Sequence, residues 1–111
     1  MNDIERFENH VDLLFLKPAD KPGKRLHAAV GIAGEAGEVL DAIKKNWIYD
    51  ADLDVENILE ECGDLLFYIT ALLLHSGHTL QDAMWHNIDK LSKRYPEGYT
   101  DHHARERMDK S

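Results

Sequence analysis

The chain has 111 residues, a length that suits one domain with a single core and leaves little room for a second. Its formal charge of -8 argues against nucleic-acid binding, because neutralising phosphates requires a surplus of lysine and arginine. No apolar run approaches the roughly 18 to 20 residues that span a bilayer, and the N-terminus lacks the order of a secretory signal. We therefore expect a single cytoplasmic domain over residues 1–111, with neither nucleic acid nor a membrane as its partner.

Hydrophobic spacing predicts helices from the start of the chain. Asn2 or Asp3 caps a first helix, in which apolar residues recur at steps of three and four as far as Phe15, and the string KPADKPG ends it. A second helix is expected over about residues 24–46. Its apolar side consists of Leu26, Val30, Ala33, Leu40 and Ile43.

A third helix is predicted over about residues 54–75, where Ser76 and Gly77 stop it. Between Leu65 and Leu74 it is apolar almost all round, which indicates burial on several sides. This helix offers more apolar surface than one small chain easily covers. We therefore expect the chain to associate with itself.

A fourth helix is predicted over about residues 79–95, behind the capping-box pattern TLQD. The segment TDHHARERM, residues 100–108, is expected to add a short last helix. No stretch alternates apolar and polar residues convincingly, so strands are not expected. The predicted fold class is all-α, close to a four-helix bundle.

Negative charge is concentrated in the middle of the chain. Residues 35–64 hold ten acidic and two basic residues, a balance of -8, whereas the rest of the chain is neutral overall. Self-repulsion of this kind disfavours folding unless cations or hydrogen bonds offset it. The acidic residues are Glu35, Glu38, Asp41, Asp50, Asp52, Asp54, Glu56, Glu60, Glu61 and Asp64.

Glu35 and Glu38 lie three residues apart on the second helix and point away from its apolar side. They share their side of the helix with small residues, which are Ala28, Gly31 and Ala42. We expect these small residues to leave room for a bulky metal-bound ligand beside the carboxylates.

On the third helix, Glu61 and Asp64 align with Asn57 and Tyr68, opposite an apolar side that includes Cys62. Four carboxylates on two facing helices would form an oxygen-only site, and Mg²⁺ or Mn²⁺ prefers oxygen ligands. Asp64 stands at the edge of a predicted core, where an unpaired charge is costly without a cation.

The single cysteine is predicted to be a small buried apolar residue.

Two other functional classes remain open. The segment DADLDVENILEE, residues 50–61, resembles a calcium-binding EF-hand loop, but Val55 occupies the place of the glycine that the sharp turn needs. Its acidic positions are Asp50, Asp52, Asp54 and Glu61. Alternatively, the acidic stripe binds a basic partner and the chain is a non-enzymatic helical interaction module. Metal-dependent turnover of a nucleotide would separate an enzyme from such a module.

The strings GEAGEVLDAIKK and ILEECGDLLFYI contain ExxE on one helix and ExxD on the next. Their order and separation, together with NIDKLSKRYPEGY at residues 87–99, resemble the all-α nucleoside triphosphate pyrophosphohydrolases of the MazG type, in particular short phage and bacterial members. The resemblance covers roughly residues 24–100. It implies a MazG fold and the cytoplasm of a bacterium or of a phage-infected cell.

The resemblance also implies an activity. A nucleoside triphosphate, which we expect to be a deoxynucleotide, would be hydrolysed to the monophosphate and pyrophosphate by water attack at the α-phosphorus. Divalent metal, Mg²⁺ or Mn²⁺, would be held by Glu35, Glu38, Glu61 and Asp64. Glu35 or Glu38 would in addition orient the water, and the residues leave open which one does so.

Candidate substrate-binding residues follow on the fourth helix. Asn87, Lys90 and Arg94 share one face, which suits phosphate oxygens and sugar hydroxyls. Tyr95 and Tyr99 are predicted to close over the substrate. The family resemblance implies homodimers or homotetramers in which a neighbour's residues complete the nucleotide pocket.

Overall fold

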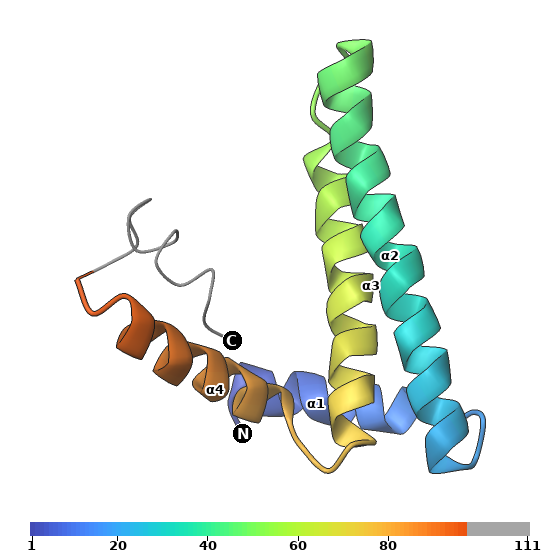
Figure 1. Ribbon diagram of the computed structural model, residues 1–111. Helices are drawn as coiled ribbons and strands as arrows, with labels where there is room; N and C mark the ends of the chain where they lie inside the picture. Colours follow the sequence, from blue (N-terminus) through green and yellow to red (C-terminus); the bar gives the residue numbers. More distant parts are fainter. Residues whose placement is uncertain (98–111) are drawn as a thin grey trace. The chain divides into compact units, whose positions relative to one another are not determined.

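A computed structural model describes residues 1–97, and these residues form four α-helices (Figure 1). The helices are α1 (Asp3–Leu14), α2 (Lys21–Tyr49), α3 (Val55–Leu74) and α4 (Leu80–Arg94). Residues 1–97 contain no strand, so the predicted all-α class is confirmed. The short helix predicted over residues 100–108 lies outside the described residues. Within residues 1–97, no helix combines the length and the apolar character that crossing a membrane requires.

The helices fall into two compact units. The first unit, Met1–Leu80, contains α1, α2 and α3, and the second begins at Gln81 and contains nearly all of α4. Within α4, Lys93 and Asp89 form an ion pair of 3.1 Å between Nζ and Oδ2. Lys93 lies in the last helical turn, where a positive charge interacts favourably with the helix dipole. The single domain expected over residues 1–111 stays a prediction.

Side-chain caps determine where the first three helices begin. Asn2 caps α1, because its Oδ1 accepts the Glu5 N–H at 2.8 Å while the Glu5 carboxylate accepts the Asn2 N–H at 3.1 Å. Asp20 caps α2 through the Gly23 N–H at 2.8 Å, and Pro22 suits the first turn. This cap explains why α2 begins three residues before the predicted start. Asp54 caps α3 in the same way.

Two left-handed residues end the long helices. Asp50 follows α2 with φ 53°, and the Asn46 side-chain amide donates to the Ala51 carbonyl at 2.8 Å. After α3, Gly77 adopts φ 84°, a conformation that costs glycine little because it has no Cβ. The chain then turns back so that the His78 N–H donates to the Leu73 carbonyl at 2.9 Å. The predicted stop at Ser76 and Gly77 is therefore confirmed.

α2 and α3 lie side by side as an antiparallel hairpin (Figure 1). Small residues of α2 allow the close approach: Ala28 and Ala42 are buried, and a Cβ at Gly31 would overlap the ring of Tyr68. We call this line of contact the seam. The bed of small residues predicted to leave room for a ligand is thus mainly the surface on which α3 packs, and that part of the interpretation was wrong.

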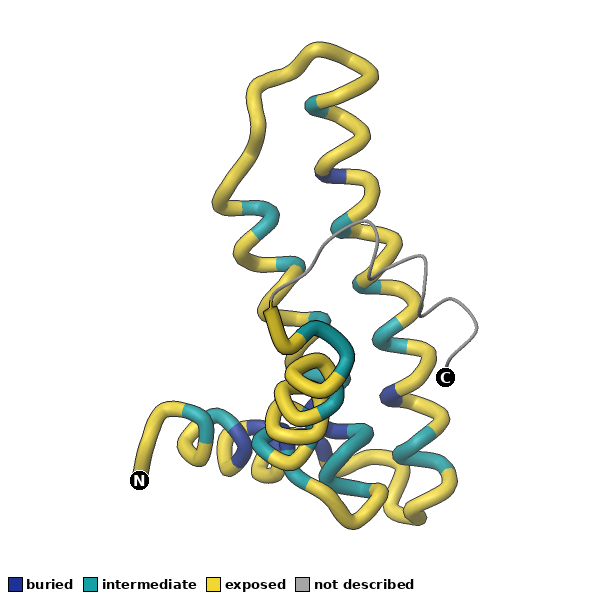
Figure 2. Tube along the Cα trace, turned by 60° about the vertical axis from the view of Figure 1, so that its left-hand side comes forward, coloured by how far each residue is buried: buried dark blue, intermediate teal, exposed yellow. Residues whose placement is uncertain are grey.

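The core lies where α1 packs against the hairpin, and Figure 2 shows most of the buried residues there. Phe15 stacks on His27 with ring centroids 4.7 Å apart, and the ring of His75 lies at 5.7 Å. The buried members of this core are Val11, Phe15, Ala28 and Ala71, with Phe7, Phe67, Tyr68, Leu72 and Leu74 packed against them. Between residues 65 and 74 of α3, Thr70 and Ala71 are buried, seven residues are partly buried and Leu66 is exposed, so the expected burial on several sides is found only in part.

The predicted apolar side of α2 is not a core. Every one of its residues is exposed, namely Leu26, Val30, Ala33, Leu40 and Ile43. Cys62 of α3 is exposed as well, so the prediction that it is buried was wrong. The physical reason is that α2 uses its small-residue side to approach α3, which turns its larger apolar residues outward.

Candidate metal centre

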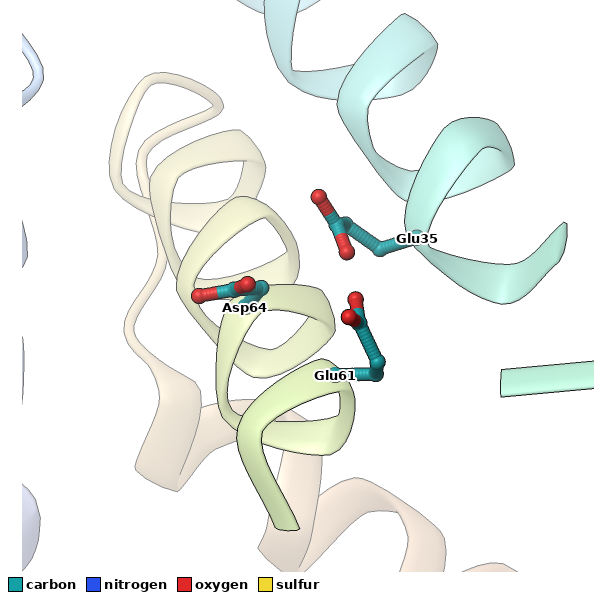
Figure 3. A group of neighbouring side chains, drawn as sticks. All are labelled: Glu35, Glu61 and Asp64. Atoms are coloured by element: carbon teal, nitrogen blue, oxygen red, sulfur yellow. The ribbon is translucent and has the colours of Figure 1, made fainter. Parts of the chain in front are cut away.

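The seam carries three acidic side chains about halfway along the hairpin. Glu35 lies one turn beyond Gly31 on α2, and its carboxylate reaches toward Glu61 and Asp64 on α3 (Figure 3). One oxygen from each carboxyl group lies within 4.8 Å of the others. Glu35 and Glu61 are partly buried and Asp64 is exposed. Helix packing alone therefore brings together three of the four acids that the sequence singled out.

The electrostatics of this cluster are unfavourable for three carboxylates alone. Glu35 Oε2 is buried and has no hydrogen-bond partner. A side-chain hydrogen bond to Glu35, followed by desolvation and the negative charges of Glu35 and Asp64, raises the pKa of Glu61 above its ordinary value. A proton or a cation at this point would relieve the repulsion.

The donor set fits a hard divalent cation. All the available ligand atoms are carboxylate oxygens, which Mg²⁺ and Mn²⁺ prefer. The unpartnered Oε2 of Glu35 offers a lone pair that nothing in the described part of the chain uses. These residues therefore fit the metal that the sequence predicts.

Glu38 is placed differently from the other three acids. It lies nearly one turn beyond Glu35 on α2, is exposed, and does not belong to the cluster of three. Gly34 and Gly37 flank the two glutamates, and a Cβ at either glycine would meet nothing within 4 Å. Both glycines are exposed, so this open space is the outer surface of α2 and is not evidence of room for a ligand beside the carboxylates. The role of Glu38 stays a prediction.

The EF-hand alternative fails on structure as well as on sequence. Asp54 caps α3 through the Asn57 N–H at 3.0 Å, and the helix begins at Val55. The second half of the proposed loop is therefore helical, and Glu61 faces Glu35 across the seam. Within residues 1–97, Asp50 and Asp52 take part in no group of three potential ligands.

The candidate substrate-binding residues belong to the second unit. Asn87, Lys90 and Arg94 lie on α4, and Tyr95 follows it with its N–H bonded to the Leu91 carbonyl at 2.8 Å. Asn87 is exposed, and the other three are partly buried. Their role in binding nucleotide stays a prediction, and Tyr99 lies outside the described residues.

Sequence reasoning missed the part that Gly31 and Tyr68 play next to the site. Tyr68 aligns with the acids, but its ring packs edge-on against Phe15 and Phe67. Gly31 makes room for that ring and so sets the distance between the helices that carry the acids. Small residues at steps of three and four are a known signal of close helix packing and could have revealed this.

Comparison with known proteins gives one result. No curated protein and no solved structure matches the chain significantly. Residues 25–99 match the MazG nucleotide pyrophosphohydrolase domain, and this range includes the whole seam with all four predicted acids. The match covers most of the 111 residues, so the chain belongs to the MazG nucleotide pyrophosphohydrolase family.

Proposed function

We propose that the chain hydrolyses a nucleoside triphosphate to the monophosphate and pyrophosphate, by attack of water at the α-phosphorus. The observation that supports this most is the meeting of Glu35, Glu61 and Asp64 in the seam, where a buried Glu35 oxygen has no partner. Family membership supports the general activity. The metal dependence, the substrate and the position of attack are our proposal.

The carboxylates of Glu35, Glu61 and Asp64 would hold Mg²⁺ or Mn²⁺, with Glu38 as a fourth ligand at the exposed side. A bound divalent cation would neutralise negative charge on the phosphate oxygens. Because two of the three clustered acids are partly buried, their charges are screened less than those of surface carboxylates. The site would therefore bind cations more strongly than the acidic residues elsewhere on the hairpin.

The attacking water must be oriented toward the α-phosphorus, and a base must accept its proton. The oxygen of the water bonds to the α-phosphorus, and the bond between the α-phosphorus and the oxygen that bridges it to the β-phosphorus breaks. A proton of the water passes to a carboxylate, and pyrophosphate leaves. Glu35 and Glu38 are the two candidates for this carboxylate. The sequence contains no GxxxxGK[ST] loop of the kind that positions terminal phosphates, which favours attack at the α-phosphorus.

The remaining parts of the proposal concern substrate and assembly. Asn87, Lys90 and Arg94 would bind phosphate oxygens and sugar hydroxyls, and Tyr95 would close over the nucleotide. The substrate is proposed to be a deoxynucleotide. The working form is proposed to be a homodimer or homotetramer.

The test is a screen of the common ribo- and deoxyribonucleoside triphosphates with Mg²⁺ or Mn²⁺, read by product chromatography. We expect a monophosphate and pyrophosphate in equal amounts. Hydrolysis in ¹⁸O-labelled water should then put the label in the monophosphate and leave pyrophosphate unlabelled. Label in pyrophosphate would mean attack at the β-phosphorus, and diphosphate with labelled orthophosphate would mean attack at the terminal phosphorus.

The non-enzymatic interaction module is the second candidate, and the concentration of acidic residues on the hairpin favours it. It predicts binding of a basic partner without any turnover. Activity that requires Glu61 would exclude it, whereas a folded, metal-loaded protein that hydrolyses no nucleotide would favour it.

A further inference from the structure

The seam is tightly packed one helical turn away from the carboxylate cluster. A Cβ added at Gly31 would lie closer than 3.0 Å to three atoms of the Tyr68 ring, whereas ordinary van der Waals contact begins at 3.4 Å. The ring therefore lies directly against the backbone of α2, in room that only glycine leaves. At this level the bulk of one aromatic ring sets the distance between α2 and α3.

This contact is a neighbour of the cluster on both helices. Gly31 precedes Glu35 by four residues on α2, and Tyr68 follows Asp64 by four residues on α3. Four helical residues rise ~6 Å, so the contact and the cluster are adjacent along the seam. The carboxylates of the cluster come from the same two helices (Figure 3). A change in helix separation at Gly31 therefore changes the separation of the carboxylates.

The ring of Tyr68 is held in place by other rings. Its centroid lies 5.6 Å from that of Phe67, 5.9 Å from that of His27 and 6.3 Å from that of Phe15. Phe15 is itself only 4% exposed. Because packed cores contain few voids, the Tyr68 ring has little room to withdraw. A larger residue at position 31 would therefore displace the helix, and the ring would stay in place.

Ion size makes the helix separation matter chemically. Oxygen ligands lie about 2.0–2.1 Å from Mg²⁺ and about 2.3–2.6 Å from Ca²⁺. Two oxygens on opposite sides of the ion are therefore about 4.1 Å apart around Mg²⁺ and about 4.6–5.2 Å apart around Ca²⁺. One oxygen from each of Glu35, Glu61 and Asp64 lies within 4.8 Å of the others. A widening of ~0.5–1 Å thus separates a cluster that closes on Mg²⁺ from one that only the larger ion fills.

We propose that the Gly31–Tyr68 contact is a spacer that fits the carboxylate cluster to Mg²⁺ in preference to larger cations such as Ca²⁺. Tyr68 is then a positioning residue, which acts through Glu35 and Asp64 without touching metal or substrate. This role rests on the metal site proposed above and specifies how that site selects its ion. Mg²⁺ demands near-ideal geometry and Ca²⁺ tolerates irregular geometry, so an error in the spacing penalises Mg²⁺ more.

The first experiment titrates the metal-free protein with MgCl₂ and with CaCl₂ in a calorimeter, without nucleotide. Gly31→Ala should weaken Mg²⁺ binding about tenfold or more and change Ca²⁺ binding less than about threefold, because the added methyl group pushes the helices apart. Gly34→Ala is the matched control, since its Cβ would meet nothing within 4 Å. It should leave both affinities unchanged.

Tyr68→Phe separates the bulk of the ring from the chemistry of its hydroxyl group. The phenylalanine ring keeps the thickness of the spacer, so the ratio of the Mg²⁺ and Ca²⁺ affinities should stay within about twofold of the wild type. A shift as large as that of Gly31→Ala would assign the effect to the hydroxyl group and would overturn the spacer.

A second measurement uses the unmodified protein, in case Gly31→Ala fails to fold. Ca²⁺ should force the helices apart at the spacer, whereas Mg²⁺ should fit without doing so. In NMR spectra, the signals of the Gly31 amide and the Tyr68 ring should therefore shift with Ca²⁺ and move much less with Mg²⁺. Gly77, in the turn after α3, is the reference signal that neither ion should shift. Equal shifts with the two ions, or no shift with either, would overturn the spacer.

The calorimetric results separate the spacer from the metal site on which it rests. A wild-type protein that binds neither cation would contradict both. Equal loss of Mg²⁺ and Ca²⁺ binding in Gly31→Ala, or the same change in Gly34→Ala, would contradict the spacer and leave the metal site in place. None of these measurements depends on turnover, so the proposed attack of water at the α-phosphorus stands or fails separately.

Discussion

The two ends of the α2–α3 hairpin are stabilised by different means. At the base, where α1 packs, the chain buries its own side chains around Phe15, and aromatic rings lie on both sides of the seam. From the middle of the hairpin to its tip at residues 50–54, the seam holds small residues and carboxylates, and the larger apolar residues are exposed. The base is thus complete within one chain. The middle of the hairpin carries the carboxylate cluster, and the half toward the tip leaves large apolar side chains exposed.

Phe15→Ala should have the largest effect on stability, because it removes the ring that joins α1 to both helices of the hairpin. Loss of a buried phenylalanine costs about 3–5 kcal/mol, a large part of the stability of a small domain. Unfolding in urea, followed by circular dichroism, measures it. Val30→Ala, on the exposed side of α2, should cost less than about 0.5 kcal/mol. Equal costs would mean that the base is not the main source of stability.

Glu61→Gln should have the largest effect on activity, lowering turnover about 100-fold or more, because it removes a ligand charge from the cluster. Glu60→Gln is the matched control, since Glu60 is the preceding residue, is exposed, and takes no part in the cluster. Both variants should keep their helical circular dichroism. Similar activity in the two variants would remove Glu61 from the site.

Glu38→Gln and Asp64→Asn extend this test to the exposed side of the cluster. Each is expected to abolish turnover while leaving the helices intact, because each removes a proposed ligand charge. Full activity of Glu38→Gln would restrict the site to the three acids that meet in the seam.

The helices of this chain could be predicted from its sequence because their signals are local. Caps such as Asn2 and Asp54, and the stop at Gly77, act within a few residues, and the predicted ends differ from the observed ones by at most three residues. The meeting of Glu35 with Glu61 and Asp64 also followed from helical spacing, once two facing helices were assumed.

The side on which α2 packs could not be predicted in the same way. Periodicity divides α2 into a side with Leu40 and a side with Gly31, and hydrophobicity favours the first as the core. The close contact between Gly31 and Tyr68 decided otherwise, because small side chains let two helix backbones approach. Which side of α2 packs against α3 depends on contacts between residues far apart in the sequence. Local sequence patterns contain no information about these contacts.

Gly31→Ala tests this seam directly. The added methyl group would overlap the ring of Tyr68, and overpacking of this kind costs about 1–3 kcal/mol. Part of this cost is offset, because alanine favours a helix over glycine by about 1 kcal/mol. Gly34→Ala is the control: it gains the same propensity in open space and should stabilise the protein. If both variants were stabilised equally in a urea titration, close packing at Gly31 would not hold the hairpin together.

The carboxylate cluster should make the stability of the metal-free protein depend on pH. Since the pKa of Glu61 is raised above 4.5, the folded state binds its proton more tightly than the unfolded state does. Stability should therefore fall as the pH rises from 4.5 through the raised value. Glu61→Gln should remove this fall, and Mg²⁺ or Mn²⁺ should reverse it in the wild type. Thermal unfolding with and without metal measures both effects, and an unchanged pH profile in Glu61→Gln would contradict the argument.

The smallest expected effect comes from the base of the hairpin and has the opposite sign. Burial, followed by the positive charge of Lys24, lowers the pKa of His75 below 6.5; Lys21 and Arg25 act in the same direction and Asp12 opposes them. The unfolded state thus binds the His75 proton more tightly, and stability should decline as the pH falls below 6.5.

His75→Phe keeps a ring beside Phe15 and cannot be protonated, and the backbone carbonyl that accepts the Arg25 guanidinium hydrogen bond at 2.9 Å is retained. As the pH falls below 6.5, the variant should therefore lose less stability than the protein with His75. Above pH 6.5 the pH dependence of stability should be nearly the same in the two proteins. Thermal unfolding across this pH range isolates the effect. Both proteins carry Glu61→Gln, so that Glu61, with its raised pKa, contributes no pH dependence of its own. A parallel decline in both proteins would mean that protonation of His75 does not weaken the base, and that its sensitivity to acid arises elsewhere.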